Sequence, residues 1–518
     1  MSFIGHTGPP SILFDADEDR LSAQSAGVPP FFVDLNLDQI IDAVTANRSA
    51  YDLEPFFYLP LGRVDSVVYR HEVFRDLENP SLFEQVQSFA QRMRDVRVHL
   101  ALADKLHDRL HKEGWFLRAV EIYCDAVERL AADLAGTSLE SRGLLAFRDY
   151  LAAYAADTYF TALMHEAKRL TADLAEVSYC VLVQDSSFTV RNYESELDYS
   201  AEIDETFKKF QQGAVKDYKV RYRHTPEDMN HIEAKILEFV AQLNPDLFSR
   251  LLDYRARHAN FIDETIIRFD REVHFYIAYL EHIARFKGAG LQFCYPQVSA
   301  KSRAVRVCEA FDLALAQKLM AENSLIVCND FSLQGEERII IVTGPNQGGK
   351  TTFARMFGQL HYLASLGCPV PGHEARLFLF DQLFTHFERE EKVENLRGKL
   401  EDDLVRVRAI LQRASPRSII VMNEVFTSTT VQDELFLSRK VIERLDDMDL
   451  LCVWVTFLDE LAAFGEKTVS MVSTIVPDNP MLRTFKIVRR PADGLAYAIA
   501  VAEKYQLTYD RIGERIKS

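Results

Sequence analysis

The apolar positions of this chain change their spacing several times, and each change predicts a different kind of element. Residues 82–176 carry apolar side chains about every 3.6 positions and contain no proline, which predicts several long α-helices. Residues 178–224 differ, because the runs 179–183 and 188–193 look like strands and the run 216–223 alternates between two faces. We therefore expect a small β tip that interrupts a helical region.

Two proline-marked helix starts follow the β tip. Thr225-Pro226 and Asn244-Pro245 each place a capping residue before a proline at the first helical position. The second pattern repeats apolar side chains at alternating spacings of four and three, and Gly288 and Gly290 end it. This predicts one helix over residues 245–286, roughly 60 Å long. Such a helix serves either as a mechanical arm or only as a packing helix, and both interpretations stay open.

A glycine-rich loop separates a predicted strand from a predicted helix in the C-terminal half. Residues 339–342 are apolar and β-branched, and residues 351–366 repeat apolar side chains at helical spacing. Glycines let backbone N–H groups close around a polyphosphate, and the helix N-terminus adds partial positive charge. We expect Lys350 to neutralise the β and γ phosphates of ATP and Thr351 to ligate Mg²⁺. The predicted nucleotide-binding residues are Gly344, Pro345, Asn346, Gln347, Gly348, Gly349, Lys350, Thr351 and Thr352.

A second apolar run, residues 418–424, predicts the catalytic strand of an ATPase. In a P-loop ATPase an Asp at the end of this strand holds the water shell of the metal, and the next Glu polarises the attacking water. Here Glu424 is present but the Asp position is Asn423, which accepts hydrogen bonds without bringing negative charge. Glu424 and Asn423 are the candidate catalytic residues, and Thr351 and Asn423 the candidate metal-binding ones. ATP hydrolysis is left open, because weaker Mg²⁺ binding or slower turnover is expected.

A polar loop, residues 427–430, follows this strand and precedes Asp433. It can cap the next helix, or it can contact a second nucleotide-binding domain across a dimer.

Length and composition bound the class of protein. The 518 residues suggest about three or four domains, and the net charge of −17 argues against non-specific coating of nucleic acid. Seven scattered cysteines without a C-x-x-C pair indicate reduced thiols, so we expect a cytoplasmic protein. No secretory signal is evident, and no run of about eighteen apolar residues suggests a membrane span.

The C-terminal motifs resemble the ATPase domain of the MutS family of DNA mismatch-recognition proteins. The P-loop is similar to the family's G-P-N-M-G-G-K-S-T, and residues 422–433 are similar to its M-D-E-I-G-R-G-T-S-T-Y-D. Residues 327–333 resemble the lead-in that lies near the nucleotide base, and residues 494–517 the closing helices. The resemblance implies an α/β P-loop NTPase of the ABC type, preceded by a mainly helical core and lever region with a clamp-like β tip.

Several positions depart from the family pattern. The family's catalytic Asp is Asn423, and its Thr-His pair reads Thr456-Phe457, so the His that senses the γ-phosphate is missing. The segment usually rich in Ser and Thr reads Arg-Gly-Lys-Leu-Glu-Asp over residues 397–402. The F-x-E wedge motif does not stand near the N-terminus, so we expect a protein without the mismatch-wedge domain.

DNA is the partner that the resemblance implies, enclosed by a homodimer. Lys216 and, on the opposite face of the same predicted strand, Lys219, Arg221 and Arg223 occupy the clamp position and can meet phosphates. Six acidic residues lie in the same tip, so a solvated strand is the alternative. A membrane transporter's ATPase subunit is disfavoured, because its L-S-G-G-Q signature is lacking.

Two functions follow from these expectations. The first is an ATP-dependent DNA-binding clamp of the MutS type, acting in DNA repair or recombination on a branched or duplex DNA. The alternative is a nucleotide-gated protein-interaction switch with little hydrolysis and no direct DNA binding. The predicted domains are residues 1–81 (mixed and loop-rich), 82–292 (helical, with the β tip near 178–224) and 293–518 (ATPase).

Overall fold

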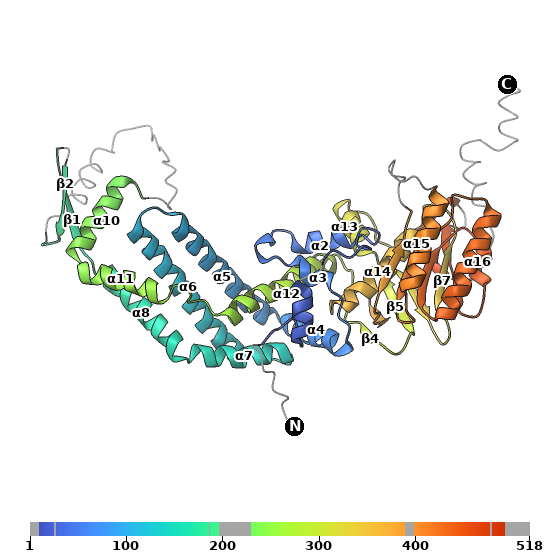
Figure 1. Ribbon diagram of the computed structural model, residues 1–518, viewed down its shortest axis with the longest axis horizontal. Helices are drawn as coiled ribbons and strands as arrows, with labels where there is room; N and C mark the ends of the chain where they lie inside the picture. Colours follow the sequence, from blue (N-terminus) through green and yellow to red (C-terminus); the bar gives the residue numbers. More distant parts are fainter. Residues whose placement is uncertain are drawn as a thin grey trace, which may run out of the picture. The chain divides into compact units, whose positions relative to one another are not determined.

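The computed structural model shows two compact units (Figure 1). The structure describes residues 10–24, 27–185, 187–195, 229–388, 398–476 and 479–492. Unit 1 comprises residues 1–78, 140–144 and 271–518, and unit 2 comprises residues 79–139 and 145–270. The predicted domain boundaries at residues 81 and 292 were drawn from composition and motifs, whereas the two units are defined by contacts. These boundaries therefore stay predictions.

Unit 2 is mainly helical, as the 3.6-residue spacing predicts. Its helices are α5 (Pro80–Lys105), α6 (Arg109–Gly136), most of α7 (Arg142–Ala155), α8 (Thr158–Ala175), α10 (His231–Leu243), α11 (Pro245–Arg257) and the start of α12 (Glu264–Gly288). Several starts are fixed by side chains that accept hydrogen bonds from backbone N–H groups, as Asp108 does from His111 and Asp157 from Tyr159. In its core, the rings of Phe147 and Phe269 stack with their centroids 3.7 Å apart.

The two strands predicted at the β tip are confirmed. Strands β1 (Tyr179–Gln184) and β2 (Ser187–Asn192) pair as an antiparallel hairpin in which Tyr179 lies opposite Asn192. The third predicted strand, residues 216–223, and the Thr225-Pro226 helix start lie outside the described residues.

The prediction of one helix over residues 245–286 is wrong. Helix α11 ends at Arg257, and α12 begins at Glu264 after Asp263, whose carboxylate accepts hydrogen bonds from the backbone N–H groups of Thr265 and Ile266. An Asp at this place starts a new helix, although the apolar spacing continues across the break. Helix α12 alone is about 38 Å long. Every side chain from residue 272 to 280 is buried, as in a packing helix.

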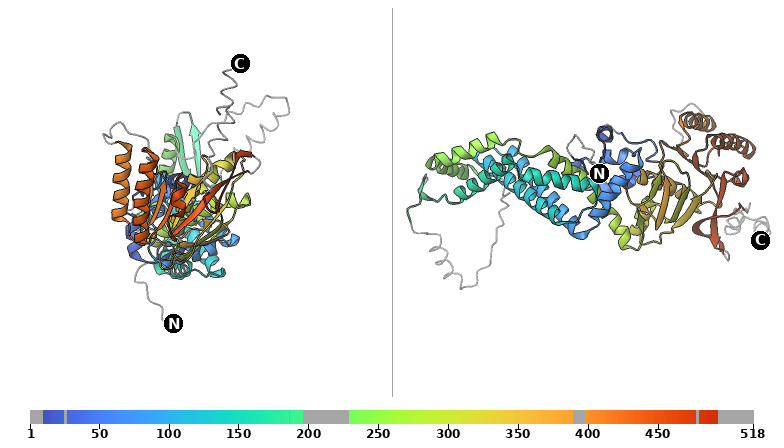
Figure 2. Two further views of the ribbon diagram at one scale, coloured as in Figure 1. Left: turned by 90° about the vertical axis from the view of Figure 1, so that its right-hand side faces the viewer. Right: turned by 90° about the horizontal axis from the view of Figure 1, so that it is seen from below.

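Unit 1 is built on a six-stranded sheet with the order β10-β11-β12-β7-β13-β14 (Figures 1 and 2). Only β14 runs antiparallel to its neighbour. Its strands are β7 (Ile339–Thr343), β10 (Leu383–His386), β11 (Ile419–Asn423), β12 (Leu451–Val455), β13 (Thr468–Val476) and β14 (Asn479–Arg489). The parallel pairing of β7, β11 and β12 brings their carboxyl ends to one edge, where the P-loop follows β7.

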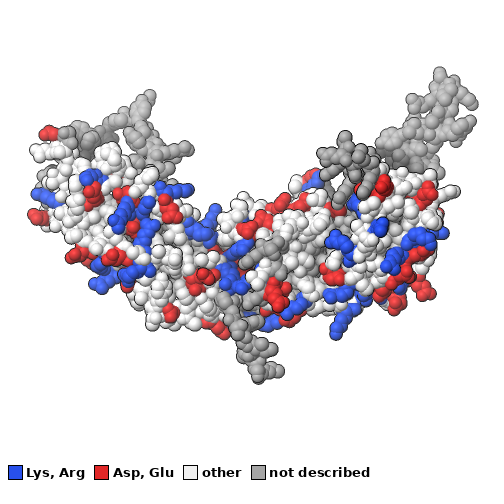
Figure 3. Space-filling model, in the orientation of Figure 1, with Lys and Arg blue, Asp and Glu red and all other residues white. Residues whose placement is uncertain are grey.

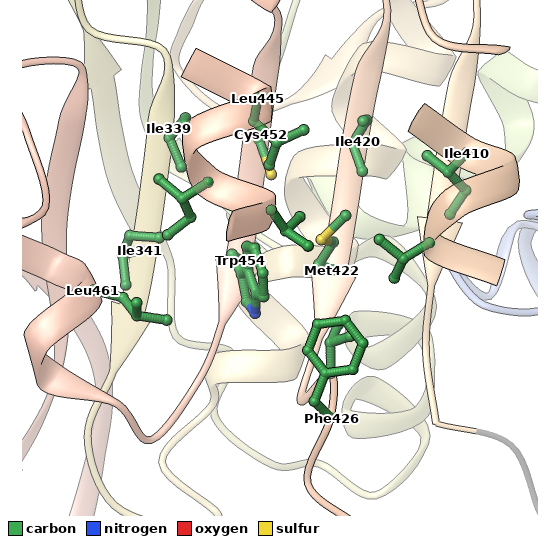
Figure 4. Packing of buried hydrophobic residues seen from close by; sticks show 14 of the residues in the cluster. Ile339, Ile341, Ile410, Ile420, Met422, Phe426, Leu445, Cys452, Trp454 and Leu461 are labelled. Atoms are coloured by element: carbon green, nitrogen blue, oxygen red, sulfur yellow. The ribbon is translucent and has the colours of Figure 1, made fainter. Parts of the chain in front are cut away.

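Helices cover both faces of this sheet. Helix α14 (Lys350–Ser365) packs on β11 and β12, and the other face carries α15 (Lys399–Arg413), α16 (Val431–Met448) and the 3₁₀ helix η2 (Asp459–Ala463). Figure 4 shows the packing on that second face, where Trp454 lies among Ile341, Met422 and Phe426. The continuous burial of β7, β11 and β12 explains their uninterrupted apolar sequence.

A smaller sheet, in the order β4-β9-β5-β6, and a β3–β8 pair complete the β structure described in unit 1. These strands are β3 (Phe293–Cys294), β4 (Gln297–Ser299), β5 (Val305–Ala310), β6 (Asn329–Leu333), β8 (Val370–Pro371) and β9 (Glu374–Phe378), with helix α13 (Leu313–Ala321) between β5 and β6. Phe331 of β6 contacts Phe353 and Phe357 of α14, so this sheet also packs against the helix that follows the P-loop.

In its described residues, the N-terminal segment of unit 1, which we expected to be mixed and loop-rich, alternates short helices with loops and turns. The helices are α1 (Asp17–Gln24), α2 (Leu37–Thr45), η1 (Ser49–Tyr51), α3 (Glu54–Tyr58) and α4 (Val64–Leu77). The segment covers α14, because Arg355 and Gln359 of that helix donate to the backbone carbonyls of Asp34 and Leu35. Tyr362 likewise donates to the carbonyl of Phe57. The P-loop helix is therefore buried on nearly all sides.

Candidate nucleotide-binding site

The predicted strand, glycine loop and helix are confirmed as β7, residues 344–349 and α14. Gly344 and Gly349 have φ angles of 120° and 91°, which residues with a Cβ rarely adopt. A Cβ on Gly348 would lie 2.2 Å from the Ser473 Oγ atom, so the close packing of the loop also requires glycine there. The backbone therefore has the compact form that a phosphate cradle requires.

Lys350 projects back over the loop from the first turn of α14. Its ammonium group donates to the carbonyls of Gly344 at 2.9 Å and Pro345 at 3.2 Å, and lies 4.1 Å from the centre of the Phe457 ring. The side chain is 4% exposed, and this burial lowers the pKa of Lys350 to about 8, against an opposing effect of Glu424. A cation held at the mouth of a glycine cradle fits a polyphosphate ligand.

Thr351 and Asn423 meet across the end of the sheet. The Thr351 hydroxyl donates to the Asn423 Oδ1 atom at 2.8 Å, so the two predicted metal-binding residues lie together. Both present neutral oxygens, which suit a Mg²⁺ ion held mainly by substrate phosphates and water. The described residues contain no group of three or more His, Cys, Asp or Glu that could hold a metal alone.

Glu424 follows β11 directly and has a left-handed backbone, with φ 53°. Its backbone N–H donates to the carbonyl of Val455 at 2.9 Å, which ties this position to the end of β12. Burial raises the pKa of Glu424, Lys350 lowers it and Glu388 raises it further. A strained, partly buried carboxyl beside the P-loop lysine is the arrangement expected of a residue that positions water.

The antiparallel hairpin β13–β14 supports the P-loop, a role that no sequence motif predicted. Ser473 donates through its hydroxyl to the Gly348 carbonyl at 2.7 Å, and Arg483 donates to the Asn346 carbonyl at 3.2 Å. Asn329, from the lead-in segment, fixes β14 by donating to Phe485 and accepting from the N–H of Ile487. Ser473 and Arg483 lie far from the loop in sequence, and the pairing of β13 with β7 and of β14 with β13 brings them there.

The polar loop before α16 caps that helix, as one interpretation expected. The Thr430 hydroxyl oxygen accepts a hydrogen bond from the N–H of Asp433, and the hydroxyl donates to the Asp433 carboxylate at 2.9 Å. Contact with a second nucleotide-binding domain stays a prediction.

Residues 340–512 match the family model for MutS domain V. Proteins named DNA mismatch repair protein MutS are similar over part of this chain. The one from Erythrobacter litoralis is 32% identical over 34% of this chain and 21% of its own length, and the one from Zymomonas mobilis is 30% identical over 37% and 23%. The one from Chloroflexus aurantiacus is 25% identical over 43% and 23%. These partial matches support a MutS-family protein.

The chain matches only about a quarter of the length of these curated relatives. The region that matches the family model includes the P-loop from β7 onward, Asn423 and Glu424. Lys216, Lys219, Arg221 and Arg223, the predicted DNA-binding residues, lie outside the described residues.

The structure also bears on the predictions about the cysteines and about membrane spans. All seven cysteines are free thiols, and three of them, Cys124, Cys368 and Cys452, are buried. Among the helices described, none combines the length and apolar character needed to cross a membrane.

The pH dependence of nucleotide binding follows from the position of Lys350. Bound phosphate favours the ammonium form, so the pKa of Lys350 is higher in the complex than the value of about 8 found here. Affinity should therefore be constant well below pH 8, begin to fall as the pH approaches 8 and then fall by up to about tenfold per pH unit, until the pKa of the complex is passed. Titration calorimetry with ADP from pH 7.5 to 9.5 measures this. A Lys350→Met variant should lose the dependence, and a flat profile in the parent would contradict the assignment.

The neutral metal-binding pair predicts the effect of restoring a charge. Asn423→Asp keeps an acceptor oxygen for the Thr351 hydroxyl and adds a negative charge, so half-maximal ATP binding should need roughly tenfold less Mg²⁺. Fluorescent-nucleotide titrations over a Mg²⁺ series test this. Binding in EDTA should not improve in the variant, and an unchanged Mg²⁺ midpoint would show that Asn423 does not face the metal.

Proposed function

We propose that this chain is an ATP-dependent, DNA-binding protein of the MutS type that acts as a homodimer in DNA repair or recombination in the cytoplasm. The observation that carries the nucleotide part is the assembly of Lys350, Thr351, Asn423 and Glu424 at one edge of the main sheet. This assembly lies within the region that matches MutS domain V, which supports an ABC-type ATPase arrangement and a role on DNA.

The site residues divide into binding and catalytic roles. The loop N–H groups and Lys350 hold the phosphates, and Thr351 with Asn423 supports Mg²⁺, which supplies charge neutralisation when bound. Glu424 orients water for attack on the terminal phosphate. Binding and hydrolysis are separable in this site, because the cradle is complete whereas Asn423 brings no charge.

A second function is favoured by the surroundings of Lys350. The Lys350 ammonium group contacts the aromatic ring of Phe457, and this side chain has no hydrogen-bond donor. A site of this kind binds nucleotide well and hydrolyses it slowly, as in a nucleotide-gated switch for a protein partner. On the face drawn in Figure 3, basic and acidic side chains are interspersed over the described residues, so this face gives no separate support for DNA binding.

One experiment separates the two functions. The purified full chain is titrated with linear, mismatched and four-way-junction DNA, without nucleotide and with ADP or ATP, at two salt concentrations. DNA binding that weakens with salt and changes with nucleotide supports the clamp, because phosphate contacts release counterions. Nucleotide binding with no DNA binding at low salt would overturn the clamp and leave the switch.

A further inference from the structure

Phe457 is an exposed aromatic residue beside the P-loop lysine. It follows β12, and its neighbour Thr456 is fixed by two hydrogen bonds, one from its N–H to Val342 and one to its hydroxyl from the N–H of Leu458. The Phe457 side chain is nevertheless 46% exposed, although burying a Phe ring is favourable. The backbone therefore places this ring beside the cradle rather than in the core.

The ring competes with phosphate for the same cation. The Lys350 ammonium group lies 4.1 Å from the ring centre and donates to two loop carbonyls, which together satisfy it within the chain. A phosphate that binds Lys350 must replace part of these contacts. In a loop of this kind the lysine reaches the β and γ phosphates, so the ring lies beside the group that would bind them.

Resting on the nucleotide binding proposed above, we propose that Phe457 is a specificity-determining residue. Its ring holds the Lys350 ammonium group and gives no hydrogen bond to a third phosphate, so the site binds nucleoside diphosphates and triphosphates with similar affinity. Only the aromatic face and the absence of a donor matter for this role. The site then reports nucleotide occupancy more than the number of phosphates.

The test compares ADP and ATP binding by the full chain at pH 7 with Mg²⁺, by calorimetry. The parent should bind the two within about threefold of each other. Phe457→Leu keeps an apolar side chain but removes the ring, so both affinities should rise about two- to fivefold. Phe436→Leu is the matched control, because Phe436 is 62% exposed on α16 and should leave both affinities unchanged.

A third variant tests the missing donor. Phe457→His places a ring N–H at this position, and a charge-assisted bond to the third phosphate should shift the ratio about tenfold toward ATP. A parent that prefers ATP more than tenfold, or a Phe457→Leu variant indistinguishable from Phe436→Leu, would overturn the inference while leaving nucleotide binding intact. A parent that binds neither ADP nor ATP would overturn the proposed nucleotide site itself. Thermal unfolding of each variant shows that the effects do not come from misfolding.

Discussion

Lys350→Ala is expected to weaken ATP and ADP binding about 30-fold or more. Lys350 is buried, with 4% of the residue exposed, and its ammonium group lies over the loop carbonyls of Gly344 and Pro345, so no solvent cation replaces it at the same place. Truncating one partner of a buried, hydrogen-bonded charge pair costs about 2–5 kcal/mol, which corresponds to a factor of about 30 or more in affinity. Both nucleotides should lose affinity, because both carry the β phosphate.

The fold should survive this substitution. Burial of the lysine disfavours its charged form, as its lowered pKa shows, so removal of the charge relieves a cost in the folded state. The thermal midpoint without nucleotide should therefore stay within about 4 °C of the parent. Lys440→Ala is the control, because Lys440 is on the exposed surface of α16, where it pairs with Glu443. Equal ATP affinity or hydrolysis in Lys350→Ala and the parent would place the activity elsewhere.

The sequence predicted those parts of the site that local patterns specify. The P-loop, the buried strand before it and the strand ending at Asn423 are each continuous in sequence, and the parallel sheet brings their ends together. The two residues that the sequence names as metal-binding candidates, Thr351 and Asn423, lie together because of this topology and share a hydrogen bond. Such motifs are predictable because each one carries its function within a few residues.

The supporting residues were not predictable in this way. Ser473 and Arg483 reach the P-loop only because β13 pairs with β7 and β14 returns beside β13. Neither residue belongs to a motif, since one hydroxyl and one guanidinium group carry no spacing signal. The helix break before Asp263 was missed for a related reason, because apolar spacing continues through a turn whose Phe261 is buried.

Arg70 shows the same dependence on long-range contacts and gives the largest expected effect on stability. Its guanidinium group donates to the carbonyls of Leu13 at 3.0 Å and Leu366 at 2.8 Å, and its side chain is 1% exposed. Leu366 is the C-cap of α14, so Arg70 neutralises the negative end of the P-loop helix and fixes the N-terminal segment to it. Gly367 has a φ angle of 71° and packs on Arg70, and a Cβ there would lie 2.8 Å from the Arg70 Cβ atom.

Arg70→Met should destabilise unit 1 by about 2–4 kcal/mol. Met retains most of the apolar packing, but both carbonyls lose their donor while they stay buried, and each unsatisfied group costs about 1–3 kcal/mol. The relief from burying a charge, which lowers the pKa of Arg70, offsets part of this loss. Because the chain has two units, the relevant thermal transition is the one that ADP raises.

The control is Arg75→Met on the same helix. Arg75 is exposed and contacts the Tyr295 ring at 4.7 Å, a contact worth only about 0.5–1 kcal/mol. Arg70→Met should lower the ADP-sensitive midpoint by several degrees more than Arg75→Met does. Equal midpoints would mean that the carbonyls of Leu13 and Leu366 find other donors, and that the N-terminal segment is held to α14 by the bonds of Arg355, Gln359 and Tyr362 alone.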